Sequence, residues 1–138
     1  MKQDKPSQKH LTDEVLGLLA YEDEEWWAAT VTVQGRKLGF YIGGDTSPDA
    51  GRLAHAREIV GSFADFSSRV GAFLADCAAT KDWERYADEI LALEIESVAL
   101  LVPGSANDGM IYFSGRDENR VWRCDYVDGK PVDLGFDS

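Results

Sequence analysis

The hydrophobic pattern of this chain changes its period twice. Residues 30–33 alternate threonine with valine, and a period of two is typical of a half-buried strand. Over residues 48–79 apolar residues recur with helical spacing instead, and from Glu94 the pattern returns to that of strands. The order strands, helices, strands predicts an α+β fold, with central helices packed on one face of antiparallel sheet.

The first group of strands is predicted to be a three-stranded antiparallel meander over residues 15–42. Its strands would cover residues 15–21, 26–33 and 37–42. The first turn is strongly acidic and consists of Glu22, Asp23, Glu24 and Glu25. Residues 1–10 are polar and show no apolar pattern, so we expect a flexible tail there and a single α+β domain over residues 11–138.

The central region is predicted to be helical, with Ser47, Pro48 and Asp49 as its start signal. One straight helix over residues 48–79 would be about 48 Å long at about 1.5 Å per residue. That length exceeds what a compact domain of this size accommodates. We therefore expect a break between Gly61 and Ser68, and a further helix that opens at residues 81–82.

The second group of strands is predicted to form C-terminal antiparallel hairpins in the same domain. The continuous apolar run at residues 98–102 is typical of a buried central strand. Strands are also expected at 109–114, 121–127 and 130–136, and Asp128-Gly129 is a strong hairpin signal. The pattern leaves open whether the two groups of strands form one sheet or two.

The charge balance restricts the classes of partner. The chain has 25 acidic and 14 basic side chains, which gives a formal net charge of −11. Nucleic acids and anionic membranes are bound through basic surfaces, so neither is expected as a partner. The acidity suits a basic protein partner, a cation, or simply solubility.

The sequence offers few residues for catalysis, and we expect neither an enzyme nor a metal or other cofactor. It has two histidines and two well-separated cysteines, and it lacks a phosphate-binding loop and a nucleophile elbow. Glu94 and Glu96 share one strand face about 7 Å apart. They would do acid–base work only if burial separated their pKa values, and the alternative is the solvated end of a strand. Reduced cysteines without a signal peptide or membrane span predict a cytoplasmic protein.

Aromatic residues provide two candidate binding surfaces. Trp26 and Trp27 are neighbours in a strand, so their indoles must point to opposite faces, and one of them is either covered by helices or exposed. Beside the acidic turn, an exposed indole would be a hot spot for a protein partner, with the candidate residues Glu22, Asp23, Glu24, Glu25, Trp26 and Trp27. The second candidate is a ligand pocket between helices and sheet, lined by Tyr112, Trp122 and Tyr126.

Residues 110–115, 121–126 and 131–137, rich in aromatics around a hairpin, look like the closing hairpins of small bacterial proteins of unknown function. Some of those proteins resemble immunity proteins found beside secreted toxins, and residues 16–27 are similar to the start of such domains. The resemblance implies a non-catalytic module that plugs a toxin's active site. A small-ligand-binding or regulatory domain is the alternative, and the pattern leaves both a monomer and a homodimer open.

Overall fold

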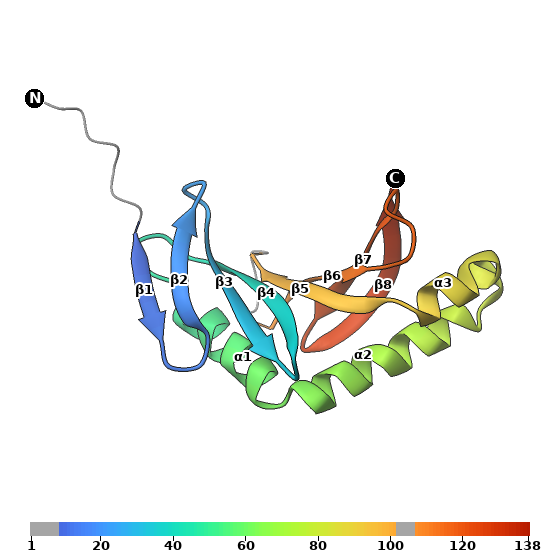
Figure 1. The fold of residues 1–138 in the computed structure, drawn as a ribbon, viewed down its shortest axis with the longest axis horizontal. Helices are drawn as coiled ribbons and strands as arrows, with labels where there is room; N and C mark the ends of the chain where they lie inside the picture. The colour runs from blue at the N-terminus through green and yellow to red at the C-terminus, as the bar shows by residue number, and fades with distance from the viewer. Residues whose placement is uncertain (1–8, 102–106) are drawn as a thin grey trace, which may run out of the picture.

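The computed structural model describes residues 9–101 and 107–138, and its strands form one mixed eight-stranded sheet (Figure 1). The strands lie in the sheet in the same order as in the sequence. They are β1 (His10–Asp13), β2 (Gly17–Glu22), β3 (Trp26–Val33), β4 (Arg36–Gly43), β5 (Glu94–Leu100), β6 (Gly109–Ser114), β7 (Val121–Val127) and β8 (Lys130–Asp137). The α+β prediction is therefore confirmed, and the open question is settled in favour of a single sheet.

The two groups of strands are joined by one parallel pair, β4 and β5, and all other neighbouring strands are antiparallel. The parallel ladder runs from the pair Gly39 and Ser97 to the pair Ile42 and Leu100. A parallel pair requires a long crossover connection, and here the helical region supplies it. The helices thus return the chain to the edge of the first meander, where the second group of strands begins.

The first meander has four strands, so the prediction of three was one strand short. The missing strand is β1, which contains a single large apolar residue, Leu11, and is mostly exposed. Its sequence therefore shows no period that would indicate a strand. His10, expected in the tail, is the first residue of β1, and the carbonyl of Lys9 accepts a hydrogen bond from the Tyr21 amide. Residues 1–8 of the expected tail lie outside the described residues.

The helical region breaks where the sequence predicted a break. It consists of α1 (Ala50–Gly61), α2 (Phe63–Ala78), the 3-10 helix η1 (Lys81–Tyr86) and α3 (Ala87–Leu91), and the break lies at Ser62. The start of α1 differs from the prediction, because the capping side chain is Asp49 and not Ser47. The Asp49 carboxylate accepts a hydrogen bond from the Arg52 amide at 3.1 Å. Asp49 therefore supplies the acceptor that the first helical turn requires.

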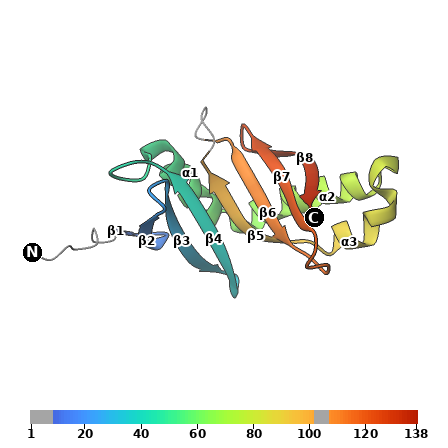
Figure 2. The same cartoon turned by 90° about the horizontal axis from the view of Figure 1, so that it is seen from above.

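The helices lie along one side of the sheet, as Figures 1 and 2 show. The core lies between the helices and the sheet. Every second residue of the strands points toward the helices and packs against them. On the strands this core includes Trp27, Phe40, Val98, Ile111, Trp122 and Cys124, and on the helices Ile59, Phe66, Val70, Leu74 and Ile90. The opposite face of the sheet carries no helix from the described residues, and we call it the open face.

The last four strands agree with the sequence pattern. Strand β5 is the expected central strand, although it begins at Glu94 and its apolar residues Val98 and Leu100 are fully buried. Residue 102, which the prediction included, lies outside the described residues. Asp128 and Gly129 both adopt positive φ angles, of 51° and 78°, between β7 and β8. The two residues therefore form the tight hairpin turn that their sequence predicted.

Candidate functional site

The acidic turn is a tight connection between β2 and β3. Asp23 and Glu24 adopt left-handed φ angles of 54° and 56°, and the Glu25 amide donates a hydrogen bond to the Glu22 carbonyl at 3.0 Å. This is the geometry of a tight hairpin turn between antiparallel strands. The side chains of Asp23, Glu24 and Glu25 are exposed, and that of Glu22 is half-buried. The turn therefore places the carboxylates of Asp23, Glu24 and Glu25 at the surface.

Trp26 and Trp27 lie on opposite faces of β3, as predicted. Trp27 is 1% exposed and packs against Tyr21 within the core, with ring centroids 5.1 Å apart. Trp26 is half-buried on the open face, where its indole meets Tyr41 edge-on at 6.0 Å and its Nε1 donates to Glu22 at 3.5 Å. Of these two tryptophans, Trp26 is the more accessible.

A further carboxylate joins this end of the molecule. The pKa of Tyr21 is raised by burial and then by the negative charges of Asp45, Glu24 and Glu25. Asp45 belongs to the segment that follows β4, so it is brought beside the acidic turn by the β3–β4 pairing. We call Glu22, Asp23, Glu24, Glu25, Asp45 and Trp26 the acidic end.

The three aromatic residues expected to line one pocket are not brought together. Trp122 and Tyr126 are buried on the helix-covered face, with 0% and 1% of their surfaces exposed. Tyr112 is half-buried on the open face, because it pairs with Arg123 and alternates with the buried Ile111 and Phe113. The prediction of a shared pocket was therefore wrong. Tyr112 lies opposite Arg123 in the neighbouring strand, so it shares a face with Arg123 and not with Trp122 or Tyr126.

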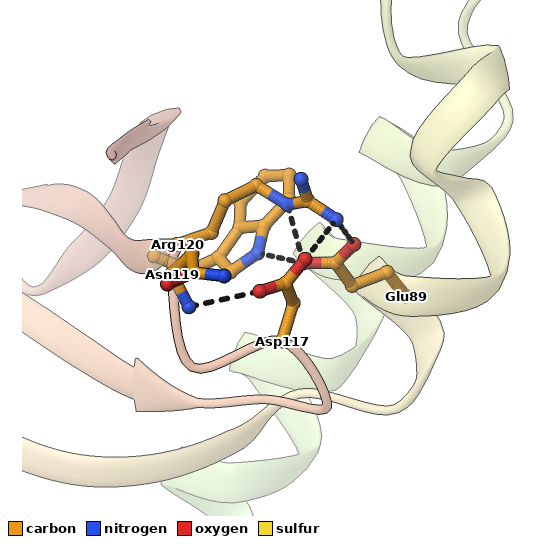
Figure 3. Close-up of polar contacts among 5 residues, drawn as sticks. Glu89, Asp117, Asn119 and Arg120 are labelled. Carbon is orange, nitrogen blue, oxygen red and sulfur yellow. Dashed lines mark hydrogen bonds and ion pairs between the residues drawn. The ribbon is translucent and has the colours of Figure 1, made fainter.

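The indole of Trp122 is held by a polar network that the sequence did not indicate. Glu89 accepts hydrogen bonds from Arg120 Nε at 2.9 Å, from Arg120 Nη2 at 2.6 Å and from Trp122 Nε1 (Figure 3). Arg120 also pairs with Asp117 at 2.9 Å and lies over the Tyr86 ring, 5.2 Å from its centroid. The hydrogen bonds from Arg120 lower the pKa of Glu89. Burial alone would raise this pKa, but its effect is smaller.

This network borders an open, polar depression of about 640 Å³ between α3 and the β6–β7 turn. Glu89 and Arg120 are 31 positions apart in the sequence, so no local spacing pattern reveals their pairing. Their charges compensate each other within the protein. The network therefore clamps α3 to the start of β7, and its charged groups are already engaged.

Tyr126 borders a second, smaller pocket. His55 Nε2 lies 2.8 Å from the Tyr126 hydroxyl, and His55 Nδ1 lies 3.3 Å from Glu58. Burial raises the pKa of Tyr126 to about 12. The pocket measures about 260 Å³ and is also lined by Ser62 and Arg69. Its polar groups bond to one another, which leaves little unsatisfied capacity for a ligand.

The remaining candidates for chemistry are either exposed or desolvated. Glu94 and Glu96 are both exposed, and a bulge in the β5–β6 register lies between Ile95 and Ser97, so the pair lacks the burial that acid–base work would need. Burial raises the pKa of the Cys124 thiol to about 12. Within residues 9–101 and 107–138, no three histidine, cysteine or carboxylate side chains converge as a metal site would require.

Comparisons of the chain with protein-family models, with curated proteins and with solved structures found no match. In the described part of the chain, no helix has both the length and the apolar character needed to cross a membrane.

Sequence reasoning missed Asp45 and Tyr41 at the acidic end. Tyr41 could have been found, because Leu38, Phe40 and Ile42 were expected on one face of their strand and Tyr41 therefore falls on the other. Asp45 gives no such signal, since its place beside the acidic turn depends on the register between β3 and β4. The acidic end is thus larger and more aromatic than its sequence alone indicates.

Proposed function

We propose that this protein is a non-catalytic, cytoplasmic module that binds a basic protein, in the manner of an immunity protein that inhibits a toxin. The observation that supports the proposal best is the acidic end, where four consecutive acidic residues adjoin the half-buried Trp26 and Asp45 adds its negative charge near Tyr21. Carboxylates held at the surface steer a basic partner toward the site, and an aromatic ring beside them supplies contact area with little loss of side-chain freedom.

The charge of the whole chain has the same sign as the acidic end. A net charge of −11 attracts a basic partner from a distance, and the acidic end gives that attraction a direction. The buried Cys124 and the exposed Glu94 and Glu96 offer no environment that would activate them, which is consistent with a role other than catalysis.

The alternative, a small-ligand-binding or regulatory domain, has a weaker basis. The pocket at Tyr126 and His55 measures about 260 Å³, and the larger depression of about 640 Å³ beside Glu89 is open and lined by charged and polar residues. Ligand pockets in proteins usually measure about 300–1,000 Å³ and are mostly apolar. We therefore favour a protein partner.

The proposal is tested by partner capture with a neutralised acidic end. The variant Glu22→Gln/Glu24→Gln/Glu25→Gln and the variant Trp26→Ala are compared with the wild-type chain as baits in extracts of the native host. Bound proteins are quantified by mass spectrometry, and each captured partner is then purified and titrated against the same baits by calorimetry. We expect a basic partner whose affinity falls by at least about tenfold in either variant.

A matched control carries the same change of net charge elsewhere. The variant Asp76→Asn/Asp82→Asn/Glu84→Gln neutralises three exposed acidic residues on the helices. It should bind the partner nearly as well as the wild-type chain. Equal loss in both triple variants would mean that total charge and not the acidic end governs binding, and a partner that binds all baits equally would contradict the proposal.

A further inference from the structure

The pairing between β2 and β3 stops well before β3 ends. It consists of three residue pairs, from Glu22 with Trp26 to Ala20 with Ala28. Beyond this point residues 17–19 of β2 pair with β1, while β3 continues to Val33. Figure 1 shows the two strands diverging from the acidic turn. Among the described residues, no strand therefore pairs with residues 29–33 of β3 on the side away from β4.

The β1–β2 hairpin is also attached to α1, by an ion pair between the buried Asp13 carboxylate and the partly exposed Arg57 guanidinium. The Asp13 carboxylate accepts hydrogen bonds from the amides of Val15 and Leu16, both at 2.9 Å, and from the Arg57 guanidinium of α1. The hairpin is thus bonded to α1 at Asp13 and to β3 only through the three residue pairs next to the acidic turn. The divergence of β2 from β3 is therefore a fixed feature of the fold.

A groove occupies the divergence. It measures about 420 Å³, and its lining includes Leu16, Leu18, Ala28, Thr30 and, at the end near the acidic turn, Glu22. Leu16 is 2% exposed and forms part of the apolar floor, whereas Leu18 is 59% exposed at the rim. The groove thus combines an apolar floor, an unpaired strand edge and a negatively charged end.

An unpaired edge of this kind is the usual acceptor for strand addition, in which main-chain hydrogen bonds provide affinity and pockets select alternate side chains. Charge decides between two occupants. A second copy of the chain would bring another net charge of −11 against the acidic end and is repelled. A basic segment is attracted by the carboxylates that begin at Glu22.

We infer that an extended basic segment of the partner lies in this groove and adds a strand to residues 29–33 of β3. The inference rests on the proposed function and specifies how the partner is recognised. Basic side chains of the segment lie toward the acidic end, and the alternate apolar side chains lie on the floor at Leu16 and Ala28.

The test uses a blocked eight-residue peptide of alternating lysine and valine as its probe, titrated into the isotope-labelled protein and followed by amide NMR shifts. We expect saturable shifts at residues 29–33 and at Gly17 and Leu18. The same peptide with alternate backbone amides N-methylated cannot complete the strand pairing, and it should bind at least about tenfold more weakly. A peptide of alternating glutamate and valine should cause no shifts there. Shifts confined to the acidic turn, or equal binding of the N-methylated peptide, would overturn the inference.

Two variants separate this inference from the proposed function. Ala28→Phe fills the groove, whereas Val132→Phe places the same ring on an exposed position of β8, away from β3 and from the lining of the groove. Circular dichroism confirms folding, and the N-methylated peptide gives an answer without any variant. A captured partner that binds Ala28→Phe as well as wild type would refute the groove while leaving the proposed function intact. A dimer in sedimentation that Ala28→Phe dissociates would assign the groove to a second copy and overturn the inference.

Discussion

Asp13 is a charged side chain that the fold buries almost completely, with 3% of its side chain exposed. Its carboxylate replaces the lost water with two backbone amides and the Arg57 guanidinium. The hydrogen bond from Arg57 is the largest cause that lowers the pKa of Asp13 from 3.8 to about 2. Burial alone would raise that pKa, so the partners outweigh desolvation.

The first prediction concerns Asp13→Asn. Because the folded-state pKa is lowered, the ionised carboxylate stabilises the fold above pH 3.8, and this contribution is lost as pH falls toward about 2. The substitution should lower the free energy of unfolding by about 2–3 kcal/mol at neutral pH. Urea unfolding at pH 7 and near pH 2.5 measures both values, and the difference between variant and wild type should shrink at the lower pH. Asp65→Asn, at an exposed position on α2, is the control and should change little. A difference that stays constant with pH would contradict the assignment.

The sheet face of some aromatic residues could be predicted from the sequence, and that of others could not. The alternation of side chains placed Trp26 and Trp27 on opposite faces of β3, because that consequence follows from strand geometry alone. The same rule cannot by itself say whether Tyr112 and Trp122 share a face. The two residues lie on different strands, and the answer depends on how those strands are aligned. Register is set by Phe113 pairing with Trp122, and nothing local in the sequence specifies that pair.

At the scale of elements, α3 is a short helix that depends on its contacts. It has five residues, so its own hydrogen bonds contribute little stability. Glu89 attaches it to β7 through Arg120 and Trp122, as Figure 3 shows for the charged residues. Ile90, which is fully buried, supplies the apolar contact.

The second prediction is that Glu89→Gln loosens this attachment. The neutral amide cannot make the paired, charge-assisted hydrogen bonds with Arg120, so the free energy of unfolding should fall by about 1–3 kcal/mol at neutral pH. Since the Arg120 hydrogen bond lowers the pKa of Glu89 below its ordinary 4.5, the loss should diminish as pH falls below that value. Thermal unfolding across pH 7 to about pH 3 checks the trend. Asp88→Asn, the exposed neighbour, should change little, and equal effects of the two would show that Glu89 has no special role.

Some elements and pairings could not be predicted from the sequence, for physical reasons. Strand β1 (His10–Asp13) has no apolar pattern of its own. It is held by its pairing with β2 and by the hydrogen bonds of Asp13. A helix that begins at residues 81–82 was predicted. Its first six residues form the 3-10 helix η1, and the α-helix α3 follows. The parallel pairing of β4 with β5 was beyond local reasoning, because it depends on how the whole helical crossover packs on the sheet.

At the scale of the whole molecule, the net charge of −11 bears on the proposed association with a basic partner. Charge-steered association is fast at low salt and slows as salt screens the attraction. The Debye length falls from about 10 Å at about 0.1 M salt to about 3 Å at about 1 M.

The third prediction follows from this screening. The association rate constant with the captured basic partner should fall by at least about tenfold between those salt concentrations, while the dissociation rate constant changes much less. Stopped-flow fluorescence of the tryptophans measures both rate constants. The variant with Gln at positions 22, 24 and 25 should show a weaker salt dependence than its helix-neutralised control. An association rate that is insensitive to salt would exclude steering by the acidic end.

The parallel ladder between β4 and β5 has a consequence for synthesis. Four residue pairs join the two halves of the sheet, and the second half follows the first only after all the helices have been made. During translation the first meander emerges complete except for its partner along β4, whose edge carries the apolar Phe40 and Ile42. That edge stays unpaired until β5 leaves the ribosome, so we expect the growing chain to expose an open strand edge along β4 for as long as the helices are being made.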